Sequence, residues 1–187
     1  MTKDTKLVAD KLKRWKKYLN EYELPAWENI PSIGLYMEQV IALLKQYLDY
    51  LPPELKEEQF ITSATINNYV RLKIIPEPIK KKYYRPHIAY LIIVLTMKKG
   101  VALSLISELV PADMSEEEIR EFYNKYSQLH KCACTYFTDE VAKAAAPLLD
   151  HDLTSLVEVT SVEELVALSS VISGFSHLLS EKLLMLE

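Results

Sequence analysis

Two adjacent asparagines and an arginine lie at helical spacing in the middle of the chain, at Asn67, Asn68 and Arg71. If Ile66 and Val70 point into a core, these three side chains point outward from the opposite face. Asparagine can form two hydrogen bonds to adenine in a DNA major groove, and arginine can form two to guanine. The chemistry that this pattern supports is sequence readout on double-stranded DNA, and the alternative is an ordinary solvated helix and turn.

Positive charge gathers around the same residues, although the chain of 187 residues has a formal net charge of −4. Residues 60–100 carry eight basic side chains and one acidic one, whereas residues 101–187 carry five basic and fifteen acidic ones. A basic patch attracts phosphate, and lysines on an extended turn suit the DNA backbone, which positions a protein without reading sequence. We expect the middle segment to attract anions and the C-terminal third to repel them.

A second set of reactive side chains, His130, Cys132 and Cys134, forms an H-x-C-x-C string. On a helix, His130 and Cys134 share a face while Cys132 points elsewhere, and no second cysteine pair completes a zinc site. We expect ordinary small buried thiols, with a redox-sensing pair as the alternative. The sequence has no glycine-rich phosphate loop, no G-x-S-x-G and no H-E-x-x-H. We therefore expect no enzyme, no metal and no cofactor.

The elements that position these side chains are predicted to be mainly α-helical. Glycine occurs only three times and the apolar spacing is mostly helical, which disfavours a β-sandwich or barrel. A capping-box pair, Ser115 and Glu118, starts a long helix that ends or kinks at Pro147. The other predicted helices cover residues 5–22, 35–51, 63–72, 86–99, 103–110 and 162–186.

The segment after the helix over residues 63–72 is predicted to be irregular. Pro76 and Pro78 end that helix, because neither can donate a backbone hydrogen bond. The IKKKYY stretch, residues 79–84, is expected to be short and extended or hairpin-like, because its aromatics and its alternation suit a strand. Pro86 then begins the next helix at a first-turn position.

Three parts of residues 61–110 resemble, in order, the MerR-type winged helix-turn-helix family. The first is ITSATINNYVRLKIIP, in which Thr62 stands at the capping serine and Thr65 and Ile66 match a Thr-Ile pair. Its last three residues match the Leu-Leu-Pro exit into the wing. KKKYYR resembles the basic wing, and GVALSLISELV resembles the family's G-F-S-L-x-E-I-x-x-L-L.

Three positions depart from that family. Asn67 replaces a basic residue and Asn68 an aromatic one, so the base preference of the family does not carry over. Lys73 replaces the turn glycine, so the turn either differs or contains a left-handed lysine.

The combination of LYMEQV, ITSATINNYV and PEPIKKKYYRPHIAYL is also similar to an uncharacterised bacterial family, domain-of-unknown-function family 1836, over roughly residues 27–110. That resemblance implies a MerR-like DNA-binding fold and a regulatory role. The expected fold is mainly α, a winged helix-turn-helix with a small wing hairpin and with flanking and C-terminal helices. We expect an N-terminal helix in residues 1–26, the DNA-binding domain in 27–111, and an acidic helical module in 112–187.

On this interpretation the helix over residues 63–72 enters the major groove, and a wing over residues 79–85 contacts phosphates. The protein would be a transcriptional regulator that binds double-stranded DNA. The candidate DNA-binding residues are Ser63, Asn67, Asn68, Tyr69, Arg71, Lys73, Lys80, Lys81, Lys82, Tyr83 and Arg85.

An apolar stripe in the acidic module has the alternating three- and four-residue spacing of a helix-packing seam. It is either a dimer interface or core within the chain. DNA sites read by such helices are usually two-fold, which favours a homodimer. The stripe consists of Leu165, Leu168, Ile172, Phe175 and Leu179.

The alternative function is a protein-interaction adaptor whose winged helix does not bind nucleic acid. The acidic C-terminal third fits it, because that segment could cover the basic patch or dock a basic partner. We expect a cytoplasmic protein, because no secretory signal is present. We expect no membrane span, because the longest apolar run, residues 88–97, is too short to cross a bilayer. The sequence identifies no small-molecule effector.

Overall fold

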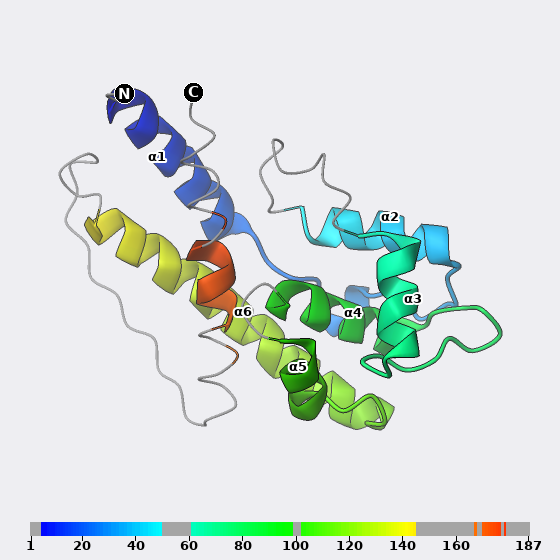
Figure 1. Ribbon diagram of the computed structural model, residues 1–187. Coiled ribbons are helices and arrows are strands. Elements are labelled where there is room, and N and C mark those ends of the chain that lie inside the picture. Colours follow the sequence, from blue (N-terminus) through cyan, green and yellow to red (C-terminus); the bar gives the residue numbers. More distant parts are fainter. Residues whose placement is uncertain are drawn as a thin grey trace. The chain divides into compact units, whose positions relative to one another are not determined.

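The computed structural model describes residues 5–49, 61–98, 102–144, 167, 170–176 and 178 (Figure 1). Within these residues the regular elements are all helical, and two isolated antiparallel bridges take the place of any β-strand. Residues 170–176 are also helical. The mainly α fold is therefore confirmed. The labelled elements are α1 (Thr5–Glu21), η1 (Trp27–Asn29), α2 (Met37–Tyr47), α3 (Ser63–Arg71), α4 (Arg85–Met97), α5 (Leu103–Leu109) and α6 (Glu116–Ala144).

The chain divides into two compact units, whose boundary lies inside α6. The central unit is Leu24–Gln128, and the terminal unit combines Met1–Glu23 with Leu129–Glu187. The central unit is wider than the DNA-binding domain expected over residues 27–111, because it includes the first part of α6.

Helix α4 forms the core of the central unit. Every residue from His87 to Met97 is buried, as expected for a helix that is apolar on all sides. Its polar groups have partners within the unit: the Tyr90 hydroxyl donates to the Pro111 carbonyl oxygen over 2.7 Å, and Thr96 Oγ1 donates to the Ile92 carbonyl oxygen over 2.8 Å. None of the described helices combines the length and the hydropathy that a bilayer span requires.

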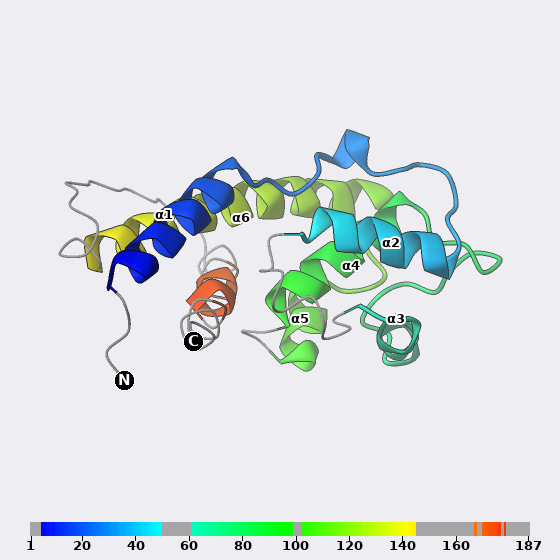
Figure 2. The same ribbon diagram turned by 90° about the horizontal axis from the view of Figure 1, so that it is seen from above.

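Helices α2 and α3 pack together at the edge of the central unit, and α2 also packs on α4. Figure 2 shows α3 almost end-on while α2 runs across the view, so the two helices cross. The buried side chains of α3 are Ile66 and Tyr69. Full burial of a side chain such as Ile66 contributes ~1.5–3 kcal/mol, which fixes one face of α3 inward and leaves the other in solvent.

The wing hairpin is not present as a pair of strands in the described segment 61–98. Ile79 and Lys82 form one isolated bridge with two 3.0 Å hydrogen bonds, and the pairing goes no further. Tyr83 instead pairs with Leu35 through bonds of 2.8 and 2.9 Å. The apolar spacing predicted a helix that begins at Leu35. In the structure α2 begins at Met37, because Leu35 is instead paired with Tyr83.

The terminal unit contains α1, the second part of α6 and residues 170–176. Phe175 is buried against two rings of α6, with centroid distances of 5.6 Å to both His130 and Phe137. Phe175 thus packs within the chain, as the intramolecular alternative for the apolar stripe requires. Ile172 is half-buried, while Leu165, Leu168 and Leu179 lie outside the described residues.

Candidate nucleic-acid interface

The first part of the candidate interface is the outward side of α3, which we call the polar face: Ser63, Asn67, Asn68 and Arg71. The helix begins where the sequence indicated, because Thr62 Oγ1 accepts a 3.1 Å hydrogen bond from the Thr65 N–H. Asn67, Arg71 and Ser63 are exposed and Asn68 is half-buried. The two amides and the guanidinium therefore reach solvent from one helix.

Two members of the polar face are joined to each other. Arg71 Nη2 donates a 2.7 Å hydrogen bond to Asn68 Oδ1. Residues three apart lie on the same side of a helix, so this bond costs no distortion of α3. It holds the long arginine side chain against the helix surface and fixes which way the Asn68 amide faces.

Helix α3 ends in a Schellman motif centred on Lys73. The Lys73 N–H donates to the Val70 carbonyl oxygen and the Ile74 N–H donates to the Tyr69 carbonyl oxygen, both over 2.9 Å. The motif needs a left-handed residue at Lys73, whose φ is 55°. The left-handed lysine that was one of the two expectations for this turn is therefore confirmed.

The second part of the candidate interface is the basic loop, residues 72–84, which connects α3 to α4 and extends outward beyond α3 in Figure 1. Its tip is a tight turn in which Lys80 and Lys81 have φ values of 50° and 64°. Two consecutive left-handed residues between the bridged Ile79 and Lys82 are the signature of a type I′ turn. Both tip lysines are exposed.

Lys82 is held in place at the base of the turn. Its ammonium lies 5.2 Å from the centroid of the exposed Tyr36 ring. Its stem passes close to Gly34, where an added Cβ would come within 3.0 Å of Lys82 Cβ and 2.8 Å of the Tyr84 ring. Gly34 is therefore needed for the close approach of the two segments.

His87 links the two arms of the basic loop to the start of α4. Its Nδ1 accepts a 3.1 Å hydrogen bond from the Tyr84 N–H, and its Nε2 lies 3.0 Å from the Glu77 carbonyl oxygen. The imidazole is 5% exposed. Sequence analysis missed Gly34, Tyr36 and His87, because their roles depend on segments that are distant along the chain or on a loop geometry that periodicity does not record.

Two of the predicted site residues, Tyr69 and Tyr83, are buried in the unit, and a third, Arg85, is half-buried. Tyr69 and Tyr83 are each 3% exposed, and burial raises the pKa of Tyr69 to about 12. Arg85 donates from Nε to the Ile30 carbonyl oxygen over 2.7 Å, and its guanidinium lies 5.9 Å from the centroid of the Trp27 ring. Burial of Tyr69 and Tyr83 does not fit their expected contacts with DNA, whereas the half-buried Arg85 is held by the Ile30 carbonyl and the Trp27 ring.

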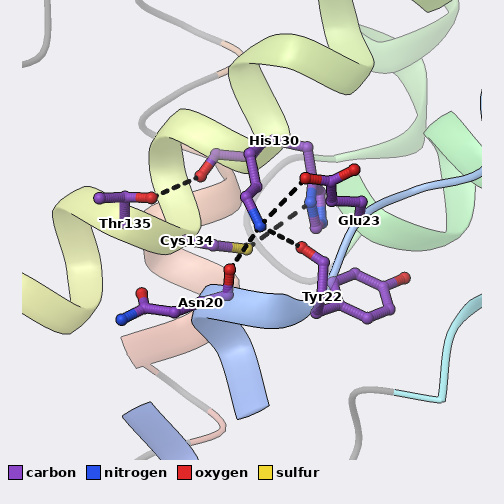
Figure 3. Close-up of polar contacts among 7 residues, drawn as sticks. Asn20, Tyr22, Glu23, His130, Cys134 and Thr135 are labelled. Atoms are coloured by element: carbon purple, nitrogen blue, oxygen red, sulfur yellow. Dashed lines mark hydrogen bonds and ion pairs between the residues drawn. The ribbon is translucent and has the colours of Figure 1, made fainter. Parts of the chain in front are cut away.

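The H-x-C-x-C string lies on α6 in the terminal unit, and Figure 3 shows two of its members, His130 and Cys134. Cys134 Sγ lies 3.7 Å from His130 Nδ1, and the two share a face as predicted. Burial lowers the pKa of His130 to about 3 and raises that of Cys134 to about 12. Cys134 is buried as expected, but Cys132 is exposed, so the expectation of two buried thiols is wrong for Cys132. In the part of the chain that the structure describes, no group of three potential metal ligands occurs.

Lys131, next to His130, caps the C-terminal end of α1. Its Nζ donates to the carbonyl oxygens of Asn20 and Tyr22 over 2.6 and 3.1 Å, and it lies 3.3 Å from Glu23 Oε1. An ammonium has three protons, and this one has three acceptors. The cluster therefore has a structural explanation, as a helix C-cap that satisfies carbonyl groups of the last turn.

Comparison with known proteins finds a family match for the central part of the chain. The sequence model of a family described as "Domain of unknown function (DUF1836)" matches residues 25–126, which is more than half of the chain. No curated protein and no solved structure matches significantly. The matched range nearly coincides with the central unit, Leu24–Gln128, so the family's domain corresponds to the unit that carries α3 and the basic loop.

Proposed function

We propose that this chain, which belongs to the DUF1836 family of domains of unknown function, is a transcriptional regulator that binds double-stranded DNA. In the proposal the central unit acts as a MerR-like helix-turn-helix. The polar face of α3 enters the major groove, and the basic loop contacts phosphates in the way that a wing does, although it is a single bridged turn.

The main support for the proposal is that the residues with a left-handed backbone conformation are lysines. The non-glycine residues with positive φ in the described part of the chain are Lys73, Lys80 and Lys81. A left-handed backbone costs an L-residue with a Cβ roughly 1–2 kcal/mol, and glycine avoids that cost. Lysine at all three positions therefore suggests that the ammonium groups are needed there for something other than folding.

Phosphate binding is the simplest use for them. Lys73 lies at the end of α3 and the other two at the tip of the basic loop, where Lys82 adds a fourth ammonium. Phosphate contacts fix the position of a protein on the duplex, while base edges are read by the helix in the groove. Asn67, Asn68 and Arg71 are the proposed base-reading residues. A homodimer would bind DNA sites that have two-fold symmetry.

The proposal is tested by fluorescence anisotropy of the full chain on random-sequence duplex DNA over a range of salt concentrations. Charge reversal of Lys80, Lys81 and Lys82 to Glu should weaken binding to all duplexes alike and reduce the salt slope by about 0.9 per lost phosphate contact. The matched control reverses three exposed lysines elsewhere, Lys13, Lys45 and Lys125, which gives the same change in net charge. Equal affinity of the two triple variants for duplex would refute the phosphate-binding role of the basic loop.

A second candidate, the protein-interaction adaptor, is favoured by apolar side chains beside the same loop. Ile33 is 69% exposed, and Tyr36 and Ile79 are each 57% exposed. Tyr36 and Ile79 both contact Lys82, and Ile33 precedes Gly34, against which the Lys82 stem packs. An electrophoretic shift on random duplex at two salt concentrations separates the candidates, because an adaptor shows no salt-dependent shift.

A further inference from the structure

We propose that Asn68 and Arg71 act together as a reader of guanine that presents only hydrogen-bond donors to the base. The inference rests on the proposed DNA binding by α3, and it names the base that this part of the helix prefers. It replaces the simpler expectation that each asparagine of the polar face reads adenine by itself.

The orientation of the Asn68 amide is set by its neighbour. Arg71 Nη2 donates to Asn68 Oδ1 over 2.7 Å, a length typical of a charge-assisted hydrogen bond. The amide oxygen therefore faces the guanidinium, one turn further along α3, and the Nδ2 amino group faces away from it. Both side chains leave the same side of the helix, next to each other.

The groups that remain accessible to a base are donors, because Arg71 occupies the Asn68 oxygen. A guanidinium has five N–H donors and no acceptor, and the bond to Asn68 uses one of them. The Asn68 amino group adds two more donors. A base donor that approached Asn68 Oδ1 would also meet the N–H groups of Arg71, which repel it.

This pattern of donors fits one base edge. In the major groove guanine presents two acceptors, N7 and O6, whereas adenine presents the N7 acceptor beside the N6 amino donor. Cytosine presents a donor, and thymine an acceptor beside a methyl group. Guanine is the base that places two acceptors against the donors of Asn68 and Arg71.

Asn67 differs from Asn68 although the two are adjacent. It is exposed, and its side chain makes no hydrogen bond to any other residue in the described part of the chain. Its amide is free to turn and to offer a donor and an acceptor together, which suits adenine. The prediction of a guanine preference therefore applies to Asn68 and not to Asn67. Comparing the effects of the two asparagines on base preference tests the role of the bond to Arg71.

The test uses the full chain and duplexes with a randomised centre. Binding sites are selected for the wild-type protein and for Arg71→Lys, and the position whose preference differs between them is assigned to Arg71. At that position we expect wild type to prefer guanine by about 10- to 100-fold over the other bases. Replacing this guanine by 7-deazaguanine, which lacks the N7 acceptor, should weaken wild-type binding about tenfold.

The variant Asn68→Ala then separates the pair from a lone arginine. Without the amide to hold it, the guanidinium should lose most of its discrimination, and the guanine preference should fall to within about threefold. Asn67→Ala should change the preference at a different position. Thermal unfolding of each variant shows whether the fold is retained, which is expected because all three side chains reach solvent.

An adenine preference at the position assigned to Arg71 would overturn the inference while DNA binding itself stands. So would a guanine preference that Asn68→Ala leaves at its wild-type strength. If wild type binds no duplex at low salt, the proposed function fails, and the inference fails with it.

Discussion

His87 Nδ1 accepts a 3.1 Å hydrogen bond from the backbone N–H of Tyr84. Because Nδ1 accepts, the proton of the neutral ring is on Nε2, which donates to the Glu77 carbonyl oxygen over 3.0 Å. In a hairpin continued from the Ile79 and Lys82 bridge, Tyr84 and Glu77 would be the next hydrogen-bonded pair. The imidazole thus stands between two backbone groups that a strand pair would join directly.

This arrangement predicts that His87→Leu destabilises the protein. The leucine would leave the Glu77 carbonyl and the Tyr84 N–H without their partner, at a cost of ~1–3 kcal/mol for each group that stays buried. We expect the free energy of unfolding in urea to fall by about 2 kcal/mol or more. His87→Gln, which can keep at least one of the two bonds, is the matched control. Equal stability of the two variants would show that the imidazole does not hold the loop.

A second prediction separates stability from binding at Lys73. Lys73→Gly removes the cost of a left-handed lysine from the Schellman motif and should raise the free energy of unfolding by ~0.5–1 kcal/mol. The same variant removes an ammonium from the end of α3, so duplex affinity should fall and the salt slope should decrease by about 0.9. Lys73→Asn, which also tolerates positive φ, should behave alike.

Opposite signs for stability and affinity are the informative result. A stabilised Lys73→Gly variant with unchanged duplex affinity would remove Lys73 from the proposed interface. A destabilised one would mean that the lysine side chain supports the fold.

A third prediction applies the same reasoning to the tip of the basic loop. The pair Asn-Gly is the preferred sequence for a type I′ turn, because both residues adopt positive φ readily. The double variant Lys80→Asn, Lys81→Gly should therefore raise the melting temperature. It should also bind duplex DNA more weakly, with a salt slope lower by up to about 1.8 if each lysine neutralises one phosphate.

The control for the tip is Lys80→Ala, Lys81→Ala. It removes the same two charges but keeps the Cβ atoms that make positive φ costly. It should lose affinity to the same extent without the gain in melting temperature. Calorimetry and anisotropy on the two double variants distinguish the effect of charge from the effect of backbone conformation.

Local patterns along the chain predicted α3 well. Thr62 as the cap and the outward asparagines follow from spacing within about a dozen residues. The left-handed Lys73 was one of two alternatives, and it came from the resemblance to a family with glycine at that position. The strand character expected for residues 79–84 was not found in the structure, because Tyr83 pairs with Leu35 across 48 positions of the chain.

Side-chain roles in the basic segment were harder to predict for the same reason. Arg85 is basic and follows the lysines, so charge alone places it with them. In the structure it bonds to the carbonyl oxygen of Ile30, 55 residues away. The narrow space at Gly34 is likewise defined by Tyr84 and Lys82, and nothing near Gly34 in the sequence indicates it.

The final prediction concerns pH and the terminal unit. Burial, and secondly the neighbouring Lys131 charge, lower the pKa of His130 to about 3 from an ordinary value of 6.5. Above pH 6.5 the ring is neutral in both the folded and the unfolded chain, so His130 leaves stability independent of pH there. Between pH 6.5 and 3 the unfolded chain binds a proton that the folded chain does not, so His130 lowers stability as the pH falls, by about 1.4 kcal/mol per unit.

His130→Phe should remove this dependence, because phenylalanine does not titrate and has a ring that can pack against Phe175. We expect the variant to gain stability relative to wild type as the pH falls from 6.5 to 4.5, measured by urea unfolding. Phe137→Leu is the control: neither residue titrates, and Phe137 packs on the same Phe175 ring, so this change should shift stability equally at each pH. A constant difference between wild type and His130→Phe would mean that the folded protein also takes up a proton at His130.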